Sequence, residues 1–98
     1  MKANANHDEA RELELFAVND ADTYFAIIVP TIRNMEKKAS RGIYDPDKAT
    51  KAFEHVAEYA ARVYNTRFGS SGRRSFNPAT RRAVAAALAE RYRPELAE

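Results

Sequence analysis

The clearest pattern of apolar and polar positions lies in residues 46–68. The apolar members recur every three or four positions: Ala49, Phe53, Val56, Ala57, Ala60, Val63, Tyr64 and Phe68. This spacing places them on one face of a helix. The Asp45 side chain can accept a hydrogen bond from a backbone N–H of the first turn, and Pro46 fits the first helical position. The pattern therefore predicts a long amphipathic helix that begins at Pro46. We expect it to end at Gly69, in the left-handed conformation.

A second helical face precedes this one along the chain and comprises Tyr24, Ile27, Ile28, Ile32 and Met35. Capping oxygens and first-turn acids are available at its start, from Asn19, Asp20 and Asp22. Basic residues follow at its end, and Gly42 is suited to stop it. Pro30 lies inside this helix without an N–H to donate, at a cost of roughly 3 kcal/mol in a regular helix. We therefore expect a kink or a break near Val29.

The remaining segments complete an all-α fold, a compact domain of three or four helices with short connections. Residues 8–18 mix two periods, and we expect a short helix there rather than a strand. Asn77 and Pro78 repeat the capping pattern and open a last, alanine-rich helix that Pro94 ends. Residues 1–11 are predicted to be a flexible tail, and residues 12–98 a single helical domain. Alanine allows close helix approach, so a tight helix pair or a homodimer is expected.

Composition limits the classes of function that remain. The chain has 98 residues, a net charge of +2 and no cysteine. This length provides one core and little room for an enclosed substrate cavity. Without cysteine there is no disulfide framework, thiolate nucleophile or cysteine metal site. The longest apolar stretch, residues 25–30, is too short to cross a bilayer, and no secretion signal is recognisable, so we expect a cytoplasmic protein that does not enter membranes.

Charge is unevenly distributed along the chain. Residues 8–22 carry six acids against one arginine, whereas residues 59–89 carry six arginines and no acid. Five of these arginines flank a glycine-serine loop and the start of the last helix, where backbone amides and the helix dipole favour anions. They are the candidate anion- or partner-binding residues: Arg67, Arg73, Arg74, Arg81 and Arg82. Among the nearby aromatic residues, Phe53, Tyr64 and Phe68 fit the core, which leaves Tyr59 and Phe76 for stacking on unpaired bases.

Motifs for catalysis, metals or cofactors are weak. His55 has Glu58 beside it on one helical face, but His7 is the only other histidine and falls in the predicted tail. A zinc site needs more ligands than this, so His55 is interpreted as a surface or boundary residue. No serine lies in a nucleophile elbow, and the glycines match neither the phosphate-loop nor the dinucleotide fingerprint. We expect no catalytic residue, no metal and no cofactor.

Several short motifs follow a familiar order: residues 12–16, Asn19-Asp20, Tyr24, residues 30–34, residues 37–39, residues 41–45, residues 60–68 and residues 79–81. Together they resemble a group of small uncharacterised proteins encoded by bacteriophages and other mobile elements, over most of residues 12–92. The resemblance implies no activity and transfers no functional residue. Many of these relatives place a tryptophan and a histidine after the turn at Gly69, where this chain has residues 70–74, so the role of the loop stays open.

The expected function is that of a non-enzymatic, phage-type accessory protein that binds a macromolecular partner, in the first place a protein. Small size, missing chemical motifs and segregated charge favour a binding module over a catalyst. The alternative is a nucleic-acid-binding protein that uses the basic region of residues 62–82. That alternative requires the arginines to share one exposed face free of acids. An enzyme would require His55 to lie buried in a cleft beside a carboxylate.

Overall fold

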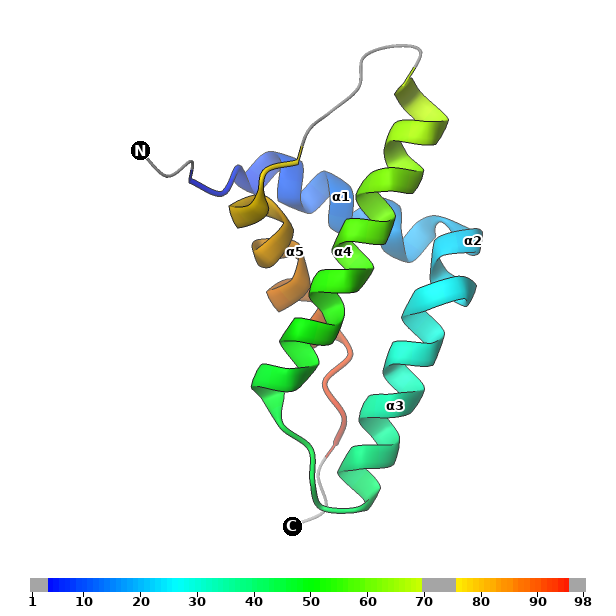
Figure 1. Ribbon diagram of the computed structural model, residues 1–98, viewed down its shortest axis with the longest axis vertical. Coiled ribbons are helices and arrows are strands. Elements are labelled where there is room, and N and C mark those ends of the chain that lie inside the picture. Colours follow the sequence, from blue (N-terminus) through cyan, green and yellow to red (C-terminus); the bar gives the residue numbers. More distant parts are fainter. Residues whose placement is uncertain (1–3, 70–75, 96–98) are drawn as a thin grey trace.

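The computed structural model describes residues 4–69 and 76–95. Within them the chain is an all-helical, compact domain, as expected, with a radius of gyration of 14.0 Å (Figure 1). Its four main helices are α1 (His7–Asn19), α3 (Val29–Ser40), α4 (Pro46–Phe68) and α5 (Pro78–Arg91). A short α2 (Ala21–Thr23) and the π-helical turn η1 (Tyr24–Ile28) lead directly into α3.

The core is built on the apolar face of α4, which confirms the long amphipathic helix with its predicted start. Phe53, Val56 and Ala60 of this face are fully buried. Leu13 of α1 and Leu88 of α5 belong to the same core and are fully buried as well, and both helices pack on α4. Burying a leucine or phenylalanine side chain contributes about 1.5–3 kcal/mol, so these contacts are the main source of stability.

Alanine is used inside the domain, between α4 and α5. Ala57 and Ala61 of α4 are buried, and so are Ala85 and Ala89 of α5. Small side chains at such a contact let two helix backbones approach closely, which agrees with the expected tight helix pair. Self-association through the remaining alanines stays a prediction.

Helix ends follow local rules almost throughout. Asp45 accepts the Asp47 N–H at 2.9 Å and Asn77 accepts the Thr80 N–H at 2.7 Å, which confirms both predicted caps. Gly42 has a φ of 71° and ends α3, where bonds from Gly42 N to Ala39 O and from Ile43 N to Lys38 O form a Schellman motif.

The prediction of a left-handed backbone conformation at Gly69 was wrong. Gly69 has a φ of −63° and keeps a right-handed helical backbone. A glycine can adopt a left-handed backbone without strain, but it does not require one. The helix still ends at Phe68, as predicted.

The N-terminal boundary also differs from the prediction. The short helix expected over residues 8–18 is confirmed as α1, but it includes residues 7–11, which the tail boundary had covered, and Ala10 is buried. Asn6 caps this helix by accepting the Glu9 N–H at 3.1 Å, and its own N–H donates to Thr80 Oγ1 at 3.0 Å. The helix is anchored by a residue 74 positions away, a contact that no local pattern indicates. Residues 1–3 of the predicted tail lie outside the described residues.

In place of the kink or break expected near Val29, the structure has a π-helical turn, and the helix is continuous through Val29. The Val29 N–H donates to Tyr24 O, five residues back. Thr23 and Ile28 are both fully buried, although five residues of a regular α-helix would separate them by about 140° around the axis. The wider turn takes up the extra residue and brings both to the core side. Pro30 follows in the first turn of α3, and its side chain is exposed.

No single helix among the described residues is long and apolar enough to cross a membrane. Helix α1 and the stretch Ala21–Ser40 reach the required length and composition only as a pair, and they are bent by 74° where they meet.

The first testable prediction concerns the caps. Replacing Asp45 or Asn77 by alanine should lower the free energy of unfolding by about 1 kcal/mol, because an amide of the first turn loses its acceptor. Urea denaturation measures the change. Asp45→Asn is the matched control, since asparagine caps as well as aspartate, and it should leave the midpoint nearly unchanged. An equal loss in Asp45→Asn and Asp45→Ala would contradict the capping role.

Candidate functional site

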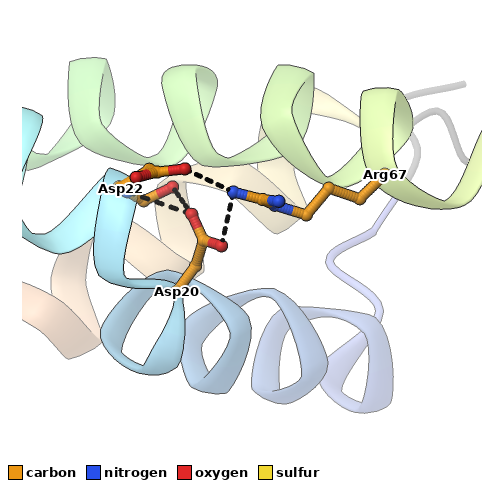
Figure 2. A network of polar contacts seen from close by, with 4 residues as sticks. Asp20, Asp22 and Arg67 are labelled. Carbon is orange, nitrogen blue, oxygen red and sulfur yellow. Dashed lines mark hydrogen bonds and ion pairs between the residues drawn. The ribbon is translucent and has the colours of Figure 1, made fainter.

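Arg67, in the last turn of α4, binds two carboxylates at the start of α2 (Figure 2). Its Nη2 lies 2.9 Å from Asp20 Oδ1 and 2.9 Å from Asp22 Oδ2. Asp20 also caps α2, because its Oδ2 accepts the Thr23 N–H at 3.0 Å and the Thr23 hydroxyl at 2.7 Å. These contacts tie the end of α4 to the bend between α1 and α2.

The three charged side chains of this network differ in their exposure to solvent. The side chain of Asp20 is only 11% exposed, whereas those of Arg67 and Asp22 are 41% and 82% exposed. Burial alone would raise the pKa of Asp20, but the two hydrogen bonds from Thr23 and the Arg67 charge outweigh it and lower that pKa below its ordinary value. The carboxylates raise the pKa of Arg67, mainly through the hydrogen bond to Asp22 and the charge of Asp20. Arg67 is therefore already paired within the chain.

Arg81 also makes a hydrogen bond within the chain. Its Nη1 donates to the carbonyl oxygen of Phe76 at 2.9 Å, just before α5 begins. Phe76 itself is buried, and its ring meets Tyr64 edge-on with centroids 5.3 Å apart. The prediction that Phe76 is free to stack on bases was wrong, because this residue fills the core from outside any helix, where periodicity gives no signal.

The other aromatic predictions are mostly confirmed. Phe53 and Tyr64 are buried, as the helical spacing predicted. Phe68 is 45% exposed, but its ring still packs against Tyr64, with centroids 4.8 Å apart. Tyr59 is half-buried and lies beside Arg62 and Arg67 in a shallow depression of about 320 Å³ on α4.

Acids also lie beside Arg81 and Arg82, the other described arginines of the candidate set. Arg81 and Arg82 of α5 line a depression of about 150 Å³ together with Glu54 and Glu58 of α4. Arg67 instead faces α2, so these arginines lie in two separate acidic surroundings. Arg73 and Arg74 lie outside the described residues. One anion-binding surface made of all five arginines stays a prediction.

The described residues also show where the candidate catalytic and metal-binding side chains lie. His55 is exposed on α4, in agreement with its interpretation as a surface residue. Among residues 4–69 and 76–95, no group of three or more histidine, aspartate and glutamate side chains could hold a metal ion. Every buried side-chain polar atom of the same residues has a hydrogen-bond partner.

Two surface features escaped the sequence analysis. Phe25 of η1 is 70% exposed, and it lies outside the apolar face that Tyr24, Ile27 and Ile28 form. The second feature is a groove of about 540 Å³ between α3 and the chain that follows α5. Its floor includes Tyr92, whose phenol pKa is raised chiefly by burial and also by Tyr24 and Glu14. The groove has no local sequence signal, because it depends on how distant segments pack.

The second testable prediction concerns Asp20. Because its folded pKa is depressed, its contribution to stability is present above the unfolded value of about 3.9 and is lost as pH falls through the folded pKa. Asp20→Asn should therefore lower the urea midpoint at pH 7 and make little difference at pH 2. Asp22→Asn removes one charge from the more exposed carboxylate of the same network, so it should destabilise less at pH 7. Equal losses at both pH values in Asp20→Asn would contradict the ionic role.

No family model matches the chain, and no curated protein and no solved structure matches it either. The resemblance to phage-encoded proteins stays a prediction that rests on the sequence motifs. The features of the molecule that bear on function are the exposed Phe25, the arginines beside acids and the groove beside α3.

Proposed function

We propose that this protein is a non-enzymatic, phage-type accessory protein that binds another protein. The observation that carries the proposal is the exposure of Phe25, at 70% the most exposed of the large apolar side chains in the described part of the chain. Three smaller apolar residues, Ala21, Ala26 and Pro30, are exposed on the same helical stretch. We call these four residues the Phe25 stripe.

The helix supports the Phe25 stripe rigidly. Tyr24 packs edge-on against Phe25, with ring centroids 5.3 Å apart, while Thr23 and Ile28 are fixed in the core on either side. A phenylalanine held in this way loses little conformational entropy on binding, and burying an aromatic ring supplies a large apolar area. Aromatic anchors of this kind often carry much of the binding energy of a protein interface.

The surroundings of the described arginines weaken the nucleic-acid alternative. Phosphate binding requires cations that can exchange solvent counterions for phosphates. Arg67 already binds two carboxylates, and Arg81 and Arg82 lie beside Glu54 and Glu58. With Phe76 buried, the described residues offer Tyr59 as the remaining aromatic of the predicted stacking pair. These observations favour a protein as the partner.

The third testable prediction addresses this partner. The tagged full chain should capture a specific protein from lysate of its own host cells, and Phe25→Ser should lower the amount captured at least tenfold, because the anchor loses its apolar area. Quantitative mass spectrometry of paired captures measures the ratio. Phe68→Ser is a matched control, since Phe68 is also partly exposed but belongs to α4. Circular dichroism checks that both variants remain folded.

Two results would contradict the proposal. One is a captured protein that Phe25→Ser and Phe68→Ser retain equally. The other is tight binding of a labelled single- or double-stranded oligonucleotide at low salt, with an affinity that falls steeply as salt rises, which would establish the nucleic-acid alternative instead.

A further inference from the structure

The groove beside α3 has two walls of different kinds. One wall is a single stripe of α3, formed by Ile32, Glu36, Ala39 and Ser40. The other wall is the segment of residues 92–95, which continues past the end of α5 without helical structure. Figure 1 shows this segment running along α3 toward the turn between α3 and α4. The volume of about 540 Å³ lies in the range of specific ligand sites, large enough for several side chains.

The lining combines an apolar surface with acidic groups. Ile32, Tyr92 and Pro94 supply much of the apolar surface, and Tyr92 is held in place by stacking on Phe53 at 6.1 Å between centroids. Glu36 on one wall and Glu95 on the other have no ion-pair partner among residues 4–69 and 76–95.

The groove also contains one cation, and it already has a neighbouring acid. Arg93 Nη1 lies 4.0 Å from Glu90 Oε2. With this charge partly offset, the two carboxylates of Glu36 and Glu95 determine the sign of the groove. They favour a cationic ligand that also carries apolar groups.

The extended wall distinguishes a peptide from a small amine. Within the described residues, the carbonyls of Arg93 and Pro94 and the N–H of Glu95 make no hydrogen bond. Backbone groups of this kind can pair with an extended peptide laid beside them, while side-chain pockets select its sequence. A small amine would use the carboxylates but leave these backbone groups without partners.

We propose that this groove binds a peptide segment of a partner protein, extended along residues 92–95, with a basic side chain between Glu36 and Glu95 and apolar side chains on Ile32 and Tyr92. The proposal rests on the proposed function only in that the ligand belongs to a protein. It adds a second contact site, separate from the Phe25 stripe, and names the chemistry that this site selects.

The experiment is a titration of the isotope-labelled full chain followed by amide chemical shifts. The probes are three capped pentapeptides: Leu-Ala-Arg-Leu-Ala, its acidic counterpart Leu-Ala-Glu-Leu-Ala, and the polar Ser-Gly-Arg-Ser-Gly. The first should shift the amides of Ala39, Ser40 and Glu95 in a saturable way, and the other two should bind at least tenfold more weakly. Glu36→Gln and Glu95→Gln should each weaken the first peptide about threefold, as expected for an exposed charge pair.

Matched variants distinguish the groove from a general effect of charge. Asp8→Asn removes an exposed acid from α1 and should leave the affinity for the first peptide unchanged. Phe25→Ser should also leave it unchanged, so a failure of the Phe25 stripe and a failure of the groove are separable. Equal binding of the basic and acidic peptides, or shifts confined to residues outside the groove, would overturn the proposal. It would also be overturned if both glutamine variants bound the first peptide as tightly as Asp8→Asn does.

Discussion

The apolar face of α4 is the constraint on which the other elements depend. Helices α1 and α5 both pack on it, and three aromatic rings, Phe16, Tyr64 and Phe76, meet around its second half. Tyr92 stacks on Phe53 near its first half, which sets the course of the chain after α5. The arm formed by α3 contacts α4 much less extensively, and Met35 is its buried residue. This difference leaves room for the groove.

Part of the uneven charge of the chain is neutralised by ion pairs within the molecule. Acids from the first quarter of the sequence meet arginines from the last third, through Arg67 with Asp20 and Asp22 and through Arg91 with Glu14 at 3.1 Å. Exposed pairs of this kind add little to stability but help to select one arrangement of helices. The uneven charge, which in the sequence suggested a binding partner, therefore serves in part to form ion pairs between helices of the same chain.

The features that could be predicted from sequence are those that neighbouring residues determine. The extent of α4 and the caps at Asp45 and Asn77 follow from side chains within a few positions of one another. The anchoring of Asn6 by Thr80 and the burial of Phe76 depend on contacts made only after folding. The candidate site shows the same division, because the arginines were visible in the sequence but the acids that pair with Arg67 lie 45 or more residues away.

The π turn at Tyr24–Ile28 amounts to one residue more than a regular helix needs. The wider turn absorbs that residue, so Thr23 before it and Ile28 at its end both reach the core, and α3 keeps its orientation. Phe25, within the same turn, is 70% exposed. A change of one residue in the length of η1 can therefore add or remove an outward-facing side chain without redesigning the interior, which makes η1 the point where this fold can acquire or lose a binding surface.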